Sequence, residues 1–418
     1  MQQQPKSNLA SEKDIRIPQQ DKVMADAVII GAGPAGAIAA QTLAEKGYTV
    51  TVFEKGPLKR EKACGGGVPE VALKEFSINF EKGRSVYGVS LCSPHNKTAV
   101  LSQKERAGIS TMRSEFDYHL VQKALRAGAE FRENSLAEPF TEQGKLKGVK
   151  TDQELHESEI VIACDGALCS FARKMGIYTG SDENQAIAFQ YQMALDNKII
   201  EERIGNLLEL YFGSQWVPLG FTWIFPKDRM VTVGNATWFH AVRNKKVDLK
   251  QMLDTFIEKH PVASEKLADA RVLYSQSHVL SFPGIVKSVY GDNFLIAGDA
   301  GGFISYATGG GMYYALVSGK IAGEVAAEAL ENGDFSRKFL KRYKKKVDKK
   351  IGADMKWGRL LRRLVLNKDR EQERFVRAVE KDPWVKEMSI LLLKEEIRYN
   401  EFLLQMLLHP HKVLKAVL

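Results

Sequence analysis

Three glycines and one carboxylate near the start of the chain have the spacing of a phosphate-binding turn. An apolar run leads into Gly31, Gly33 and Gly36, and a second apolar run, residues 49–53, ends at Glu54. Gly31 permits a tight turn, Gly33 lets the backbone approach a pyrophosphate, and Gly36 lets a helix pack closely on the strand. Free N–H groups at the helix start favour phosphate, and Glu54 would accept ribose hydroxyls. The pattern predicts a βαβ unit that binds a dinucleotide.

Two further aspartates stand beside glycines at the ends of apolar runs. Asp165-Gly166 lies in the middle of the chain, and Gly298-Asp299 precedes a glycine-rich turn near residue 300. Their order after the βαβ unit resembles the large superfamily of FAD-binding oxidoreductases and differs from a simple NAD dehydrogenase. This resemblance implies that the dinucleotide is FAD, with Asp299 at its ribityl and phosphate region.

Five segments together resemble a narrower family, the geranylgeranyl reductases, which are flavoenzymes that saturate carbon–carbon double bonds in isoprenoid chains. The segments are 63–68 (ACGGGV), 113–117 (Arg-x-x-Phe-Asp), 221–227 (FTWIFPK), 298–302 (GDAGG) and 308–311 (TGGG). The resemblance covers roughly residues 26–330.

This family resemblance implies a set of cofactor-binding residues. The adenosine diphosphate part of FAD would be held by Gly31, Gly33, Ala35, Gly36 and Glu54. Arg113 would lie near the pyrophosphate, and the backbone of Ala137, on the strand after the helix that follows Arg113, would meet the adenine. The flavin ring would be surrounded by Cys64, Gly65, Gly67, Gly311 and Met312.

Three positions depart from the family pattern. Ala236 stands where a second glycine is usual, Phe221 replaces a frequent tyrosine, and Tyr306 replaces a common proline. These changes are expected to alter the shape of the substrate site.

The chemistry of the implied reaction points to one catalytic residue. An isolated trisubstituted alkene is not electrophilic, so a hydride from reduced flavin must be matched by a proton at the other carbon. Cys64, in a glycine turn expected over the flavin, is our candidate to provide or relay that proton or to position the alkene. The alternative is a small residue that merely fills a crowded turn.

The aromatic strand at residues 221–225 is a candidate substrate wall. Phe221, Trp223 and Phe225 could line a long apolar tunnel for a polyprenyl chain, because each ring offers a wide apolar area. A purely structural role in the core is the alternative.

The order of motifs predicts an α/β fold: a Rossmann-type FAD-binding domain, similar to those of glutathione reductase and p-hydroxybenzoate hydroxylase, with an inserted antiparallel β-sheet substrate domain and a helical C-terminus. We assign residues 1–22 to a disordered tail. The FAD-binding domain takes 23–70, 105–175 and 286–335, the substrate domain 71–104 and 176–285, and the C-terminal helical region 336–418.

Composition sets limits on partners. The chain has 418 residues, 44% of them hydrophobic and 27% charged, and a net charge of +9, much of it after Ser336. Basic runs there, with leucine clusters at 391–408, favour contact with an anionic membrane, or else docking on the substrate domain. We predict no nucleic-acid partner, no metal site and no disulfide framework, since the four cysteines lack paired spacing. Without a signal peptide or a spanning segment, the expected location is the cytoplasm, with peripheral membrane contact.

Several functional questions stay open from the sequence. The reductant is NAD(P)H or a small electron carrier, and the saturated chain could belong to a lipid, a quinone, a chlorophyll precursor or a prenyl diphosphate. Residues 220–226 also resemble a motif of flavin halogenases, so a flavin monooxygenase or halogenase is a competing interpretation. A prenyl-binding escort without catalysis is a third, and the oligomeric state is left open.

Overall fold

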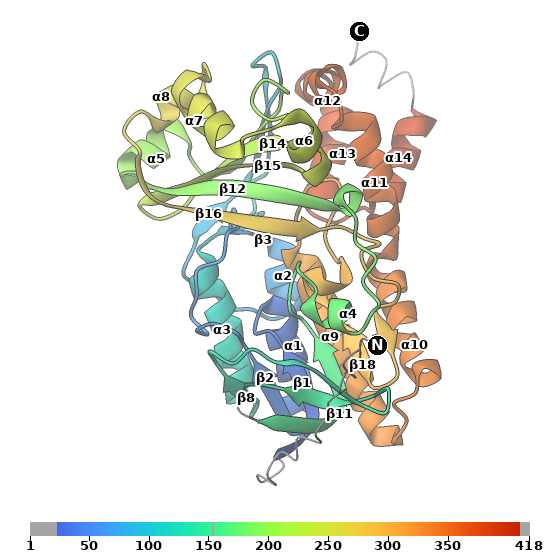
Figure 1. Cartoon of the computed structure of the whole chain (residues 1–418). Helices are drawn as coiled ribbons and strands as arrows, with labels where there is room; N and C mark the ends of the chain where they lie inside the picture. Colours follow the sequence, from blue (N-terminus) through green and yellow to red (C-terminus); the bar gives the residue numbers. More distant parts are fainter. Residues whose placement is uncertain (1–22, 153, 410–418) are drawn as a thin grey trace, which may run out of the picture.

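The computed structural model describes residues 23–152 and 154–409, so the predicted tail at 1–22 lies outside the described residues. Two large sheets are stacked one above the other, with a column of helices along one side (Figure 1). The segment assignments made from the sequence follow this division but are not tested by it, because the chain crosses between the layers several times.

The lower sheet is the predicted dinucleotide-binding layer. Its central strands run parallel in the order β18-β11-β1-β2-β8, as expected when helical crossovers connect them. The strands of this sheet are β1 (Val23–Ile30), β2 (Val50–Phe53), β8 (Glu130–Arg132), β9 (Glu138–Glu142), β10 (Lys145–Lys150), β11 (Leu155–Ala163), β17 (Tyr290–Gly291) and β18 (Phe294–Ile296). All four residues of β2 are buried, which is typical of a parallel strand covered on both faces.

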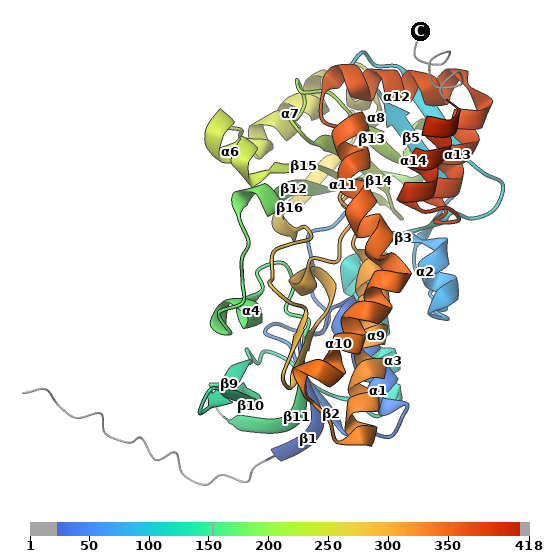
Figure 2. The ribbon, with the colours of Figure 1, turned by 90° about the vertical axis from the view of Figure 1, so that its right-hand side faces the viewer.

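Helices cover one face of this layer. They are α1 (Pro34–Ala44), α3 (Arg113–Arg126) and α9 (Met312–Asn332), whereas the short helix α4 (Ser170–Lys174) lies on the other side and contacts β9. Helix α1 packs against both α3 and α9. The β9–β10 hairpin pairs with β11 and lies on the side away from α1 and α3 (Figure 2).

The upper sheet has the order β16-β12-β15-β14-β13-β5-β6. Its strands are β5 (Gly88–Cys92), β6 (Thr98–Ser102), β12 (Gln185–Ala194), β13 (Leu207–Tyr211), β14 (Phe221–Pro226), β15 (Met230–Trp238) and β16 (Arg271–Ser281). The predicted antiparallel pairing is present throughout except between β13 and β5, which run parallel. This exception arises because the β5–β6 hairpin comes from an earlier chain segment and joins the sheet at its edge.

Helices from the inserted segment pack on the outer face of the upper sheet. They are α5 (Asn197–Arg203), α6 (Phe239–Lys245), α7 (Leu249–Lys259) and α8 (Ala263–Leu267). Ile224 of β14 packs in the cluster that contains Leu253 and Phe256 of α7. Because side chains alternate along a strand, the neighbours of Ile224 face the opposite way, towards the lower sheet.

A small sheet joins the two layers. It consists of β3 (Gly67–Pro69), β7 (Gly108–Ser110) and β4 (Arg84–Val86), with α2 (Glu70–Glu75) following β3.

The C-terminal part is helical, as predicted, over its described residues. Its helices are α10 (Arg337–Val347), α11 (Ala353–Val365), α12 (Asp369–Lys381), α13 (Pro383–Leu393) and α14 (Tyr399–Leu408), with a π-helical turn at Asp348–Gly352 between α10 and α11. Together α10 and α11 run from the lower sheet to the top of the molecule, where α12, α13 and α14 lie beside the upper sheet (Figure 2). Among residues 23–152 and 154–409, no helix combines the length and apolar character needed to cross a bilayer.

Candidate active site

A cavity of about 400 Å³ lies between the two sheets. Its walls come from the N-terminal ends of α1 and α9, the turn before β3, the inner face of β14, and the α13–α14 connection. Most of the residues predicted from the sequence line it, namely Gly33, Ala35, Cys64, Gly65, Gly67, Arg113, Phe221, Trp223, Phe225, Asp299, Gly311 and Met312. The fold therefore brings together motifs from distant parts of the chain, while the role of each residue stays a prediction.

The remaining predicted residues lie outside this lining. Gly31 and Gly36 shape the turn beneath it: a Cβ on Gly36 would lie 1.9 Å from the Gly31 carbonyl oxygen, so no side chain fits there. Glu54 is buried behind the turn. Ala137 is buried in the loop between β8 and β9, so its expected position on the strand after the helix was wrong.

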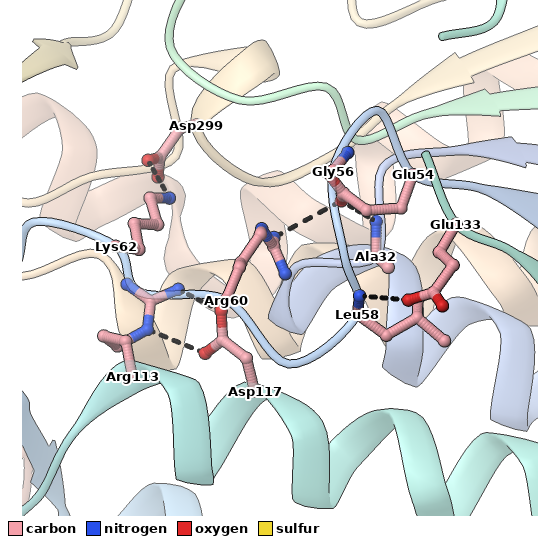
Figure 3. A network of polar contacts seen from close by, with 10 residues as sticks. All are labelled: Ala32, Glu54, Gly56, Leu58, Arg60, Lys62, Arg113, Asp117, Glu133 and Asp299. Carbon is pink, nitrogen blue, oxygen red and sulfur yellow. Dashed lines mark hydrogen bonds and ion pairs between the residues drawn. The ribbon is translucent and has the colours of Figure 1, made fainter. Parts of the chain in front are cut away.

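Glu54 organises the loop next to the glycine turn (Figure 3). Its Oε2 accepts the Ala32 N–H at 2.9 Å and lies 3.3 Å from an Arg60 guanidinium nitrogen, and its Oε1 accepts the Gly56 N–H at 3.3 Å. The carboxylate therefore ties the glycine turn before α1 to the loop that follows β2.

Basic side chains that the sequence analysis did not assign lie at this end. Arg60 stands within 4.0 Å of the position where a Gly33 side chain would begin, and Lys62 Nζ lies 3.7 Å from Asp299 (Figure 3). His278 of β16 lines the cavity in the same region, and burial together with the nearby Lys62 lowers its pKa to about 4. Arg60 and Lys62 follow Glu54 closely in the sequence and could have been suspected, whereas nothing local marks His278.

The residues at this end fit FAD. Within the described part of the chain, two buried nitrogens there, Arg60 Nη1 and His278 Nε2, have no hydrogen-bond partner. Buried polar atoms are normally paired, so such atoms beside a helix N-terminus suit a ligand with phosphates, hydroxyls and a polar ring system. The predicted FAD site is consistent with this donor set.

Cys64 lies in a turn that only glycines allow. A Cβ on Gly65 would lie 2.6 Å from the ring of Phe225, and one on Gly66 would lie 1.9 Å from the Thr111 carbonyl oxygen. The Gly66 N–H points back to the Cys64 sulfur at 3.4 Å. The turn thus presses against the aromatic strand on one side and leaves the half-buried thiol at the cavity wall.

Two buried cations flank the Cys64 thiol. Arg113 makes two hydrogen bonds of 2.7 Å to Asp117 (Figure 3) and is also within hydrogen-bonding reach of Cys64. Burial opposes its charge, but Asp117 and Cys64 outweigh burial and raise the pKa of Arg113. Lys227, which directly follows β14, lies under the same turn and donates a hydrogen bond to the Gly65 carbonyl oxygen at 2.7 Å. The sequence analysis included Lys227 in a motif without giving it a role.

The inner face of β14 forms the aromatic wall. Phe221, Trp223 and Phe225 all reach the cavity, with the Phe221 and Trp223 rings 6.1 Å apart. A Cβ on Gly234, the first glycine of the family pattern, would lie 2.3 Å from the Trp223 ring, so no side chain fits there without a shift of the ring. At the second position, Ala236 contributes to the cavity lining.

Tyr306, the third departure, belongs to a neighbouring aromatic cluster. Its ring lies 4.9 Å from Phe282 and 5.8 Å from Trp238, and its hydroxyl donates to Asn184 at 3.2 Å. The tyrosine therefore ties the glycine-rich loop to the upper sheet.

The C-terminal helices complete the cavity. Tyr399 at the start of α14 is buried, and its hydroxyl lies 2.7 Å from Ser305 Oγ in the glycine-rich loop. Arg398 pairs with Asp354 of α11 at 2.6 Å. The sequence analysis assigned none of these three C-terminal residues. In the described part of the chain, no group of His, Cys, Asp and Glu side chains could hold a metal ion.

Comparisons with known proteins agree with this geometry. Residues 184–275 match the geranylgeranyl reductase catalytic domain, and residues 29–79 match an NAD(P)-binding Rossmann-like domain. Digeranylgeranylglycerophospholipid reductase 2 of Methanosphaera stadtmanae is 31% identical over 348 residues, covering 79% of this chain and 85% of that protein. The digeranylgeranylglycerophospholipid reductase of Methanocaldococcus jannaschii is 29% identical over 320 residues, covering 74% and 79%.

Solved structures extend the comparison. A geranylgeranyl bacteriochlorophyll reductase-like protein of Thermoplasma acidophilum superimposes with a TM-score of 0.80 at 25% identity, covering 92% of this chain and 99% of that one. A flavin-dependent brominase reaches a TM-score of 0.72 at 18% identity, covering 89% and 94%. The likeness to halogenases therefore extends to the fold alone. On its motifs, its cavity and its relatives, the chain belongs to the geranylgeranyl reductase family of FAD-dependent oxidoreductases.

Proposed function

We propose that this enzyme saturates carbon–carbon double bonds of a geranylgeranyl or polyprenyl chain carried by a membrane lipid. The observation that carries the proposal is that the Cys64 turn and Asp299 line the same cavity as the aromatic face of β14. The relatives named as digeranylgeranylglycerophospholipid reductases support a lipid as the carrier.

Different residues of the chain would have different roles in this reaction. When bound, reduced FAD supplies the hydride for one carbon of the double bond. Cys64 delivers a proton to the other carbon, since its thiol is at the cavity wall. Phe221, Trp223 and Phe225 hold the chain by apolar contact and keep water away from the double bond.

The test is reduction of a defined lipid. Purified protein loaded with FAD and reduced anaerobically with dithionite is mixed with digeranylgeranylglycerophospholipid in detergent micelles, and the lipid is analysed by mass spectrometry. We expect a gain of two hydrogens per saturated double bond. Loss of the product in Asp299→Ala, which removes the carboxylate expected to contact FAD, is the matched control. An unchanged lipid with fully loaded, reduced enzyme would overturn the proposal.

The same assay distinguishes the possible carriers. A prenylated quinone, a geranylgeranylated chlorophyll precursor and free geranylgeranyl diphosphate are presented in separate reactions. We expect the lipid to be reduced most rapidly, and a faster reaction with one of the other three would reassign the carrier while keeping the chemistry.

The source of electrons is part of the proposal. We expect NAD(P)H or a small electron carrier to reduce the bound flavin. Bleaching of the flavin absorbance under anaerobic conditions by NADH or NADPH would identify the nicotinamide, and bleaching only by a reduced ferredoxin or flavodoxin would identify a carrier protein.

A membrane surface would deliver such a substrate. Leu404, Leu407 and Leu408 are exposed at helical spacing on α14, and Leu360 and Leu364 are exposed on α11 beside the basic residues 359 and 363. Side chains three and four residues apart share one face of a helix, so these leucines form apolar stripes with cations alongside. The nearby α13–α14 connection lines the cavity, which supports entry of the lipid from this side.

Binding to vesicles tests the membrane contact. The wild type should co-sediment with vesicles that contain phosphatidylglycerol, whereas a triple Leu→Ser variant at 404, 407 and 408 should stay in the supernatant. Equal sedimentation of the two proteins would exclude this face, and no sedimentation of the wild type would exclude the membrane.

A further inference from the structure

Lys227 is a buried cation placed directly beneath the turn that carries Cys64. Its side chain is only 3% exposed, and its ammonium donates to the Gly65 carbonyl oxygen at 2.7 Å and to the Thr232 hydroxyl. The Thr232 hydroxyl in turn donates to Gln192 at 2.8 Å. Both of these partners are neutral oxygens, so they fix the position of the ammonium but do not balance its charge.

Burial makes the charged form of Lys227 energetically unfavourable. Burial lowers the pKa of Lys227 to about 7, while Cys64 and then Glu61 act in the opposite direction. Removing the charge of a lysine from water is expensive, so burial alone favours the neutral amine. A thiolate at Cys64 favours the charged form of Lys227, and by the same interaction the charge of Lys227 favours the thiolate.

The other groups around Cys64 are accounted for by partners of their own. Arg113 faces the thiol from α3, but Asp117 already balances its charge through two hydrogen bonds. Glu61, on the same loop as Cys64, accepts a hydrogen bond from Ser114 at 2.7 Å and is also bonded to Tyr274 of β16. Lys227 is therefore the cation near Cys64 whose hydrogen-bond partners leave its charge unbalanced.

We propose that Lys227 is a positioning residue for Cys64: it fixes the turn through the Gly65 carbonyl and stabilises the Cys64 thiolate by its charge. The contribution of Lys227 to the reaction rests on the proposed function, in which the Cys64 thiol is the proton donor. The effect of Lys227 on the ionisation of Cys64 does not depend on any substrate.

The proton balance of the cycle is closed. As the alkene gains a hydride from the reduced cofactor, the S–H bond of Cys64 breaks and its proton forms a C–H bond at the second carbon. The thiolate then regains a proton from water that enters between turnovers, and the oxidation state of the sulfur does not change.

The pH dependence of Cys64 alkylation tests the proposal. FAD-loaded protein is treated with iodoacetamide between pH 5.5 and 10, and labelling of the Cys64 peptide is followed by mass spectrometry. Cys92, Cys164 and Cys169 are buried, so Cys64 should react first. In Lys227→Gln, the midpoint of labelling should rise by about one pH unit, because an opposite charge next to the thiolate is lost. Lys227→Arg keeps a cation and should hold the midpoint at or below the wild-type value.

Lys266→Gln is the matched control, since Lys266 pairs with buried Glu209 in the same upper sheet and is not part of the cavity lining. Its midpoint should equal that of the wild type. A Lys227→Gln midpoint that moves no further than the Lys266→Gln midpoint would overturn the proposal. If Lys227→Gln fails to fold, Thr232→Val is the second variant, because it removes one oxygen partner of the ammonium. Its labelling midpoint should rise by about half a pH unit. An unchanged midpoint in Thr232→Val would equally overturn the proposal. If the enzyme fails to reduce the alkene, the alkylation result is unaffected, so the two proposals can be refuted independently.

Discussion

The two ends of the cavity are built in different ways. At the cofactor end, backbone turns decide the shape: the Gly31–Gly36 turn and the Gly66 turn are so close to neighbouring carbonyl groups that a single methyl group would collide. At the substrate end, side chains from β14, β15 and the C-terminal helices form the wall. A backbone turn tolerates no variation, whereas an aromatic wall can change its shape by substitution. Substitutions in the aromatic wall can therefore change the shape of the substrate end without disturbing the backbone turns of the cofactor end.

The largest effect is expected when one methyl group is added at the cofactor end, which tests whether the backbone turn there tolerates any side chain. Gly36→Ala places a Cβ 1.9 Å from the Gly31 carbonyl oxygen, so the turn must move. We expect a loss of at least about 3 kcal/mol in the free energy of unfolding and little bound FAD. Chemical denaturation and flavin absorbance measure both quantities.

Gly56→Ala is the control for that variant. No atom lies within 4 Å of a Cβ at Gly56, a residue of the neighbouring loop after β2 whose N–H is bonded to Glu54. Full flavin binding by Gly36→Ala would show that the backbone turn is more yielding than its geometry indicates.

The second prediction addresses the point where the two ends meet. Cys64→Ala should retain FAD but slow single-turnover alkene reduction by prereduced enzyme by about 100-fold or more, because a positioned proton donor is lost. Cys92→Ala, a buried thiol in the upper sheet, should reduce the lipid at the wild-type rate. Unchanged rates in Cys64→Ala would remove this residue from the mechanism and leave it as a small residue in a crowded turn.

The contrast between the two ends also sets what could be predicted from the sequence. The glycine turn and its carboxylate were recognisable because backbone geometry dictates residue type over a short stretch. The strand at 221–226 was visible as alternating aromatics, and its inner face does line the cavity. The family resemblance then supplied the residues that carry the flavin, and their roles stay predictions.

What the sequence did not predict comes from long-range packing. His278 on β16 and Tyr399 on α14 reach the cavity only because distant elements are packed against it. Lys227 is adjacent to a recognised motif, yet its significance depends on burial under a turn more than 160 residues earlier in the chain. Ala137 was misplaced because β8 is short and the chain then forms a loop before β9.

The third prediction sharpens the substrate end. In Trp223→Leu, loss of the large ring should widen the cavity and shift the preference towards longer or bulkier prenyl chains by about tenfold in kcat/KM, with a loss of about 2 kcal/mol in stability. Competition between prenyl chains of two lengths measures the preference. Trp216→Leu, in the cluster on the outer face of the upper sheet, should lose stability without changing that preference. Equal behaviour of the two variants would make Trp223 a core residue only.

The smallest expected effect concerns the pH response of His278, which lies at the cofactor end but comes from the upper sheet. Because burial lowers its pKa to about 4, the folded state favours the neutral ring, whereas the unfolded chain binds a proton near pH 6.5. The stabilisation is complete above that pH and is lost progressively as the pH falls towards 4. Between pH 7 and 5.5, wild-type apoprotein should therefore lose about 1 kcal/mol more stability than His278→Gln, measured by urea denaturation. Parallel curves for the two proteins would mean that the ring of His278 is solvated, and the cofactor end would then rest on the backbone turns of the lower sheet alone.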